Sequence, residues 1–407
     1  MKVLNNISRL ILGILFIFSG FVKAIDPLGS SYKFNDYFEV WGLNGFEQFT
    51  VPLAICLSSA EFIIGICLFW NIRTKIAIWA ALFFMIFFTI LTFYIALFNP
   101  VTDCGCFGDA IKLSNWQTFF KNLIIFIPLL IIFINRKTFK PLYKTFTEWL
   151  LALIMVIIIV GLSVYCLNHL PLIDFRPYKI GTYIPAKMEM PANAAQDVYK
   201  TIIYYEKNGV KKGFSIDNLP DSTWKFVKTE SKLIKKGYEP PIHDFSIISP
   251  FNGQDITNEV LNSDDFWFIL IAYDLKKSFF EKNEIINKIY KFSIDNGYHF
   301  ICLTSSLSEE IDLIKNKYNF DFEFYNTDPI TLKTIIRSNP GLVLLKNGTV
   351  ISKWHYNDLP DIKEFSNGLL SYVINSKRIQ YNRLLIISLS LGLLLIIALV
   401  NIIIKKH

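Results

Sequence analysis

Charged residues are scarce in this chain of 407 residues. Only 18% of the residues are Asp, Glu, Lys or Arg, whereas 52% are hydrophobic, and the mean hydropathy is +0.38. Because the apolar residues gather in long runs, a soluble protein is excluded and an integral membrane protein is predicted. The formal net charge of +7 comes without a basic stripe interleaved with aromatic residues, so we expect no nucleic-acid partner.

Histidine and cysteine are also few, which limits the reactive or metal-binding sites that the chain can build. Five histidines are present, and none lies beside a pair of cysteines in the sequence. Four of the six cysteines lie in or next to apolar runs, namely Cys56, Cys67, Cys166 and Cys302. A cysteine in such a place usually serves as a small packing residue, so only Cys104 and Cys106 remain as candidates for chemistry.

Six hydrophobic segments reach or approach the roughly 20 residues that a helix needs to cross a bilayer. They are 8–23, 49–70, 75–98, 116–135, 147–167 and 384–404. The first has Lys2 before an apolar core, as a secretory signal does, but no small-x-small cleavage pattern follows Ser19 and Gly20. We therefore interpret it as a membrane helix of the mature protein.

The distribution of lysine and arginine over the short loops predicts the orientation of these helices. With the N-terminus in the cytoplasm, ten basic residues lie inside: Lys2, Arg9, Arg73, Lys75, Arg136, Lys137, Lys140, Lys144, Lys405 and Lys406. The opposite short loops then hold only Lys23, Lys33, Lys112 and Lys121. The positive-inside rule therefore predicts a cytoplasmic (inner) membrane protein with residues 168–383 outside the cytoplasm, although Lys377, Arg378 and Arg383 flank the last segment on its outer side.

A short cysteine turn lies between the third and fourth hydrophobic segments. It reads Asp103, Cys104, Gly105, Cys106, Phe107, Gly108 and Asp109, and Lys112 follows it. Two neighbouring thiols can exchange electrons as a dithiol and a disulfide, or bind a soft metal as thiolates. Gly105 and Gly108 supply backbone freedom, and the single intervening residue makes a tight ring whose disulfide should be easily reduced. Ser114 and Gln117 fit a capping box, so the next helix should begin directly after the turn.

Three interpretations of the cysteine turn stay open at this point. The pair can exchange electrons with a partner protein outside the membrane, it can be a static disulfide in a binding or assembly protein, or it can hold copper or another soft metal. A fourth hypothesis is solute transport through the bundle, for which Glu61 in the second segment is the only buried acid. An acid inside a bilayer costs roughly 2.5–3.5 kcal/mol, so Glu61 should face the bundle interior and have a partner or a function.

The segment between the fifth and sixth hydrophobic runs has the patterns of a mixed sheet. Residues 200–217 predict a hairpin that turns at Asn208-Gly209. Strands are expected at 266–273 and 297–304, with helices at 277–293 and 307–318 and a second hairpin at 339–354. A βαβ unit followed by a hairpin implies a sheet with helices on its faces.

The first 145 residues resemble the DoxX/MauE family of four-helix membrane proteins. The resemblance is carried by Arg9, Gly13, Ser19, Gly20, Lys23, Glu61 and Gly65, and above all by the run from Cys104 to Gly108. It implies a redox-associated bundle that supports disulfide formation or maturation of extracytoplasmic proteins.

Residues 237–375 resemble a thioredoxin-like domain of the peroxiredoxin or thiol-reductase branch. The run Pro241 to Ile247 is similar to the entry strand of that branch, and Pro340 stands where those proteins have a cis-proline. In the working enzymes a cysteine follows the first central strand, but the corresponding residues 272–278 contain none. The resemblance therefore implies a degenerate domain that is kept for binding, docking or shielding.

Together these observations predict a membrane all-α bundle with an α/β thioredoxin-like domain. The expected divisions are a four-helix domain at 1–145, a fifth membrane helix at 146–167, a linker and β-rich region at 168–236, the thioredoxin-like domain at 237–375 and a last membrane helix at 384–404. The leading hypothesis is thiol-disulfide exchange through Cys104 and Cys106 with an extracytoplasmic thiol or disulfide protein. Enzymatic activity as a thiol-disulfide oxidoreductase is left open, and a membrane quinone is a candidate terminal carrier.

Overall fold

The computed structural model describes residues 1–407 except 44, 102, 236, 366–367, 370 and 375–407. Five long apolar helices cover five of the six predicted segments, and the sixth, 384–404, lies outside the described residues. They are α1 (Lys2–Ile25), α3 (Thr50–Trp70), α4 (Thr74–Phe98), α5 (Asn115–Ile134) and α6 (Thr145–Asn168). By length and composition each can cross a bilayer, and the chain is a multi-pass membrane protein.

Helices α1 and α3 pack closely because glycines remove side chains from their contact. A Cβ atom added to Gly13 of α1 would lie 2.9 Å from the Cβ of Phe69, and one added to Gly20 would meet the backbone of Phe62. Small residues let membrane helices approach in this way. The cysteine turn packs against this pair of helices through α1.

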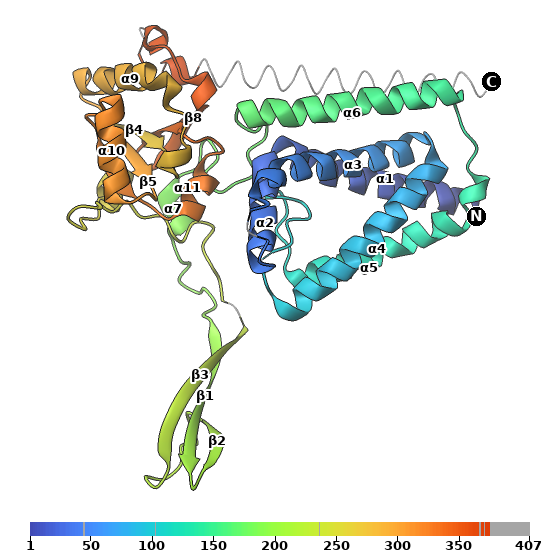
Figure 1. Ribbon diagram of the computed structural model, residues 1–407, viewed down its shortest axis with the longest axis horizontal. Coiled ribbons are helices and arrows are strands. Elements are labelled where there is room, and N and C mark those ends of the chain that lie inside the picture. The colour runs from blue at the N-terminus through green and yellow to red at the C-terminus, as the bar shows by residue number, and fades with distance from the viewer. Residues whose placement is uncertain (44, 102, 236, 366–367, 370, 375–407) are drawn as a thin grey trace.

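A helix that the sequence analysis did not predict, α2 (Pro27–Val40), follows α1 directly. Asp26 caps its start by accepting a hydrogen bond of 2.9 Å from the backbone of Gly29, and Pro27 occupies the first turn. Figure 1 shows α2 lying across the end of the bundle, between the membrane helices and the α/β domain. The end of the bundle that carries α2 is therefore the end that faces this domain.

The α/β domain is built on one five-stranded mixed sheet in the order β6-β5-β4-β7-β8. The strands are β4 (Phe266–Ile271), β5 (His299–Thr304), β6 (Glu323–Asn326), β7 (Gly341–Lys346) and β8 (Thr349–His355). Strands β4, β5 and β6 run parallel, whereas β7 is antiparallel to β4 and β8 is antiparallel to β7. The βαβ unit and terminal hairpin are the arrangement expected of a thioredoxin-like core.

Helices cover both faces of this sheet, and its central strand, β4, is apolar throughout. Phe268 and Leu270 of β4 pack against one core that includes α9 (Asn283–Asp295) and α10 (Ser308–Tyr318). The alternate residues Trp267 and Ile269 pack against a second core that includes α11 (Pro329–Ile335). All six residues of β4 are buried, as is expected for a strand covered on both sides.

Residues between α6 and the sheet domain form two further pieces. Backbone hydrogen bonds join 181–184 to β8, so part of the expected linker packs on the domain edge, followed by α7 (Ile184–Met188). The predicted hairpin is β1 (Val198–Lys207) and β2 (Val210–Ser215), and an unpredicted third strand, β3 (Lys225–Lys235), pairs with β1. Figure 1 shows this ribbon extending away from the domain; α8 (Thr257–Asn262) returns the chain to the sheet.

Candidate functional site

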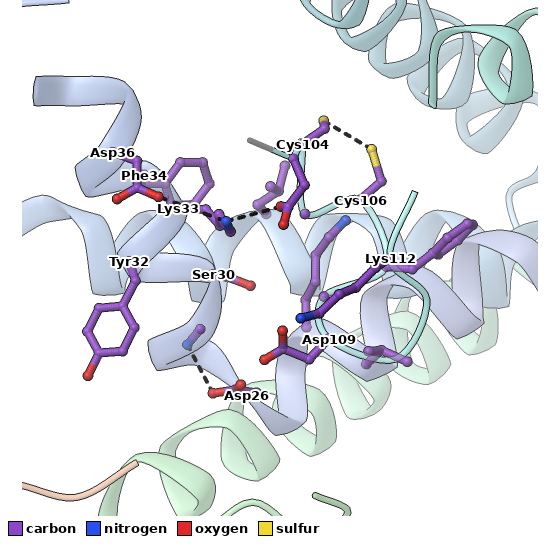
Figure 2. A pocket seen from close by; sticks show the side chains of 18 of the residues that line it. Asp26, Ser30, Tyr32, Lys33, Phe34, Asp36, Cys104, Cys106, Asp109 and Lys112 are labelled. Carbon is purple, nitrogen blue, oxygen red and sulfur yellow. Dashed lines mark hydrogen bonds and ion pairs between the residues drawn. The ribbon is translucent and has the colours of Figure 1, made fainter. Parts of the chain in front are cut away.

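The cysteine turn lies between α4 and α5, at the end of the bundle that faces the α/β domain. The sulfur atoms of Cys104 and Cys106 are 3.2 Å apart and are not bonded as a disulfide (Figure 2). Gly105 and Gly108 both have positive φ, +65° and +52°, which is where glycine is favoured. The backbone of Gly108 donates to the carbonyl of Gly105 at 3.0 Å, so the two thiols project from one closed turn.

A chain of hydrogen bonds ties this turn to the interior of the bundle. The hydroxyl of Ser19 donates to the carbonyl of Cys106 at 2.9 Å, and the ammonium of Lys23 donates to Ser19 at 3.1 Å. Lys23 also donates to both carboxylate oxygens of Glu61, at 2.6 and 2.7 Å. Lys23 and Glu61 are 7% and 3% exposed, so Lys23 belongs to the bundle interior and not, as its place in the sequence indicated, to an outer loop. Two residues of α1, one of α3 and one of the turn thus form one connected support.

The two thiols have opposite shifts in acidity because they share a hydrogen bond in a confined site. The hydrogen bond with Cys104 lowers the pKa of Cys106 to about 6; burial opposes this shift, and the ammonium groups of Lys121 and Lys23 favour the thiolate further. The same hydrogen bond, together with burial, raises the pKa of Cys104 well above its usual value. A thiolate at Cys106 beside a protonated Cys104 is the arrangement needed to begin thiol-disulfide exchange.

The other predicted residues of the turn also contact the bundle. Asp103 forms an ion pair of 3.1 Å with Lys33 of α2. Phe107 packs against Phe18, and the ammonium of Lys121 lies 4.5 Å from the centre of the Phe107 ring. These contacts fix the turn on both sides of the thiols.

Two further predicted residues, Lys112 and Arg9, lie apart from the contacts that hold the turn. Lys112 lines the cavity next to the turn (Figure 2). Arg9 does not join the turn, because its guanidinium donates to the carbonyls of Leu68 and Phe69 at the C-terminal end of α3. The capping box of Ser114 and Gln117 is present and starts α5.

Arg337 of the α/β domain connects this domain to the start of α2 and to the end of the cysteine turn. Its Nε lies 3.0 Å from each carboxylate oxygen of Asp26, which follows α1, and its Nη2 lies 3.0 Å from Asp109, which ends the turn. Arg337 is 5% exposed and its guanidinium stacks over the ring of Tyr32 at 5.2 Å. Burial raises the pKa of Asp26, but the guanidinium groups of Arg337 and, to a smaller extent, Arg176 outweigh it, so the pKa is lowered and the carboxylate stays charged.

The part of the thioredoxin-like domain that would hold its own thiols also faces the bundle. Tyr273 follows β4, and its hydroxyl shares a hydrogen bond of 3.2 Å with that of Tyr32 in α2. The peptide bond between Asn339 and Pro340 is cis, and the side chain of Asn339 donates to the carbonyl of Asp274 at 2.9 Å. Residues 272–278 are therefore positioned beside the cis-proline without a cysteine among them. Cys302 is fully buried in β5, and burial raises the pKa of its thiol well above the usual value.

A cavity of about 760 Å³ adjoins the two thiols. One part of its lining is polar, with Asp36, Lys333 and Arg337 among its walls, and another part is lined by side chains of α1, α3, α4 and α5. Cys104 and Cys106 both belong to the lining. Within the described portion of the chain, no group of three or more His, Cys, Asp or Glu side chains is placed to hold a metal ion.

Comparison with known proteins finds family matches for two parts of the chain. Residues 1–134 match the family described as methylamine utilisation protein MauE, so the chain has an N-terminal MauE domain. Residues 199–236, which include most of β1 to β3, match a domain of unknown function, DUF8463. No curated protein matches the chain.

Solved structures similar to the chain cover about a third of it. One is the C-terminal domain of a putative thiol-disulfide oxidoreductase from Bacteroides thetaiotaomicron, at 19% identity and TM-score 0.26, covering 32% of this chain and 93% of that one. Another is a putative protein disulfide isomerase from the same organism, at 16% identity and TM-score 0.24, covering 33% of this chain and 84% of that one. The thioredoxin-like assignment is carried by the strand order of the sheet and not by these likenesses.

Sequence reasoning found the thiols but missed the residues that connect them to the rest of the molecule. Arg337 and Tyr273 are 311 and 241 residues from their partners Asp26 and Tyr32, so no local pattern reveals these contacts. A signal was available for Lys23, since a lysine and an acid in facing membrane helices should pair. The molecule is thus a multi-pass membrane protein in which a MauE domain presents two free thiols beside a thioredoxin-like domain that has no cysteine at 272–278.

Proposed function

We propose that Cys104 and Cys106 cycle between dithiol and disulfide and exchange electrons with an extracytoplasmic protein, in support of disulfide formation or maturation. The observation that carries this proposal is the asymmetry of the pair, a Cys106 thiol with a pKa of about 6 whose sulfur lies 3.2 Å from that of Cys104. One thiol attacks the disulfide of a partner and the other resolves the mixed disulfide. Both positions lie in a turn that lines a cavity, where a partner sulfur can approach.

The location outside the cytoplasm is supported by charge and connectivity. The turn, α2 and the α/β domain lie at one end of the bundle, since α1 and α4 end there and α5 begins there. Because Lys23 is buried in an ion pair, this end has fewer loop cations than its sequence indicated, which strengthens the lysine and arginine bias toward the opposite end. An oxidising compartment is also where a dithiol couple of this kind can operate.

In this proposal the thioredoxin-like domain shapes access to the pair without doing thiol chemistry. Its surface around Tyr273 contacts α2, and Arg337 holds the turn itself. The domain therefore governs which proteins reach the cavity, and its β1–β3 ribbon is available for contacts with them.

Replacing Cys104 by Ser should trap a partner protein on Cys106. Without a resolving thiol, the mixed disulfide formed by the Cys106 thiolate persists, and we expect a band of higher mass that disappears on reduction. Non-reducing electrophoresis of membranes from cells that express the variant, with mass spectrometry of the band, makes the measurement.

The matched control for this experiment is Cys302→Ser, which removes a buried thiol without touching the turn. This variant keeps both Cys104 and Cys106, so it should give no such band. If the Cys104→Ser and Cys106→Ser variants both lose folded protein and never cross-link, the pair is a static brace and the proposal is wrong.

The pH dependence of alkylation provides a second test. In the reduced protein the reactivity of Cys106 toward iodoacetamide should rise through pH 6 and level off above it, because only the thiolate reacts and the pKa is lowered to about 6. Cys104→Ala removes the donor of the stabilising hydrogen bond and should move the midpoint toward the ordinary value of about 8.5. Cys104→Ser keeps a hydroxyl donor and should retain most of the shift. A midpoint near 8.5 in the unmutated pair would contradict the proposed nucleophile.

A further inference from the structure

The cavity beside the thiols extends from the aqueous end of the bundle deep into the membrane region. Phe84 of α4 belongs to its lining, and 14 residues separate it from the end of that helix at Phe98. At 1.5 Å per residue this is about 21 Å along the helix, compared with a hydrocarbon core of about 30 Å. The cavity therefore reaches the depth at which lipid-soluble molecules reside.

The deep part of the cavity has the chemistry of a site for an aromatic, apolar molecule. Its walls carry Phe16 of α1, Phe84 and Phe88 of α4, Leu57 of α3 and Ile125 of α5. Aromatic rings favour offset or edge contacts with another ring, and Phe84 already makes such contacts with Phe16 and Phe88. Pockets of 300–1,000 Å³ with mostly apolar walls and a few polar groups are typical of small-molecule sites.

The polar groups of this cavity lie where the thiols are. Lys23 and Lys121 both line it, and both favour the thiolate of Cys106. The same cations would stabilise negative charge that develops on an electron acceptor next to Cys106. Toward the lipid, Leu53 of α3 and Phe87 of α4 line the cavity yet remain 41% and 62% exposed, so the described walls do not seal it along these helices.

We propose that this cavity binds a membrane quinone, which takes the electrons of the Cys104–Cys106 dithiol. The inference rests on the proposed redox cycle of the pair and supplies its missing oxidant. In the step, the Cys106 thiolate adds to the quinone ring and forms a carbon–sulfur bond, and Cys104 then attacks the sulfur of Cys106. The sulfur–sulfur bond forms as the carbon–sulfur bond breaks. Its electron pair stays on the ring, which takes up the proton that the Cys104 thiol loses and a second proton from water, in place of the one released earlier by Cys106, and leaves as hydroquinone.

The direction of electron flow follows from the tightness of the two-cysteine ring. A disulfide that closes over a single intervening residue is easily reduced, so it passes oxidising equivalents to client thiols and must be regenerated by a stronger oxidant. A quinone in the bilayer meets that requirement, and it reaches the pair from the membrane side while the protein client reaches it from the aqueous side. The two half-reactions thus use opposite ends of one cavity.

The test uses the full chain in lipid nanodiscs, reduced and then mixed with decylubiquinone. Oxidation of the pair is followed by mass-tagging of free thiols, and hydroquinone formation is followed by absorbance. Leu91→Trp fills the cavity from α4, whereas Ile90→Trp places the same ring on the 67% exposed, non-lining neighbour. We expect Leu91→Trp to slow quinone-dependent oxidation by about tenfold or more and Ile90→Trp to change it less than about twofold. If Leu91→Trp folds poorly, Leu57→Trp serves in its place. It fills the cavity from α3 and should slow the reaction in the same way.

Exchange with a small disulfide separates this inference from the proposed function beneath it. Oxidised glutathione should oxidise the pair in wild type and in all three variants at similar rates. If glutathione acts but decylubiquinone does not, or if Leu91→Trp and Leu57→Trp react with decylubiquinone as fast as Ile90→Trp, the quinone site is wrong and the redox pair stands. If neither oxidant acts on the wild-type pair, the redox pair and the quinone site are both wrong.

Discussion

Replacing Arg337 by Met is expected to release the thioredoxin-like domain from the bundle and expose the cysteine turn. The change leaves Asp26 and Asp109 without their shared cation, and truncating one partner of a buried charge pair costs about 2–5 kcal/mol. Docking within one chain can be lost at that cost, so maleimide labelling of Cys104 and Cys106 should accelerate by about tenfold or more. The labelling rate in nanodiscs, followed by mass spectrometry, checks the result.

The matched control is Arg73→Met, which removes an arginine whose ion pair, with the buried Glu148, lies where α3 ends and α4 begins, at the opposite end of the bundle from the cysteine turn. It should destabilise its own surroundings without exposing the thiols to the same degree. Adding Asp26→Asn and Asp109→Asn to Arg337→Met should restore part of the docking, because the orphaned charges are gone. If Arg337→Met labels at the wild-type rate, the contact between domain and turn does not control access.

Separating Lys23 from Glu61 should be the most damaging single change inside the membrane. Glu61→Leu leaves a buried ammonium and Lys23→Met leaves a buried carboxylate, and breaking a buried pair typically costs about 3–5 kcal/mol. Each variant should therefore yield far less folded protein in mild detergent than the wild type. The double variant Lys23→Met with Glu61→Leu should recover much of that loss, since two apolar side chains replace the pair.

The same variants report on the thiols. Lys23 supports Ser19, whose hydroxyl holds the carbonyl of Cys106, and it also favours the Cys106 thiolate. The recovered double variant should fold yet alkylate Cys106 with a midpoint above pH 6, measured as in the titration proposed for the pair. A double variant that is as unstable as either single one would show that the two residues have separate roles.

The membrane helices and the sheet were predictable because their patterns are local. Five apolar runs match α1, α3, α4, α5 and α6, and the Asn208-Gly209 and Asn347-Gly348 turns marked both hairpins. The absence of a cysteine at 272–278 was likewise readable from the sequence, because the strand before it was recognisable.

The elements that escaped prediction lack such patterns. Helix α2 mixes polar and aromatic residues and contains Gly29 and two serines, so its start depends on the cap at Asp26 more than on periodicity. Strand β6 has only four residues, which is too short for an alternation to stand out. The sequence also placed the thiols correctly in a turn but could not show that Arg337 reaches it, because that contact exists only once the sheet domain docks.

The hydrogen bond between Tyr32 and Tyr273 joins α2 to the segment of the thioredoxin-like domain that follows β4. The segment of the domain that lies beside the cis-proline is already in contact with the molecule's own α2. The domain therefore acts toward its own chain as a cover, with Arg337 and Tyr273 seated against the end of the bundle that carries the two thiols.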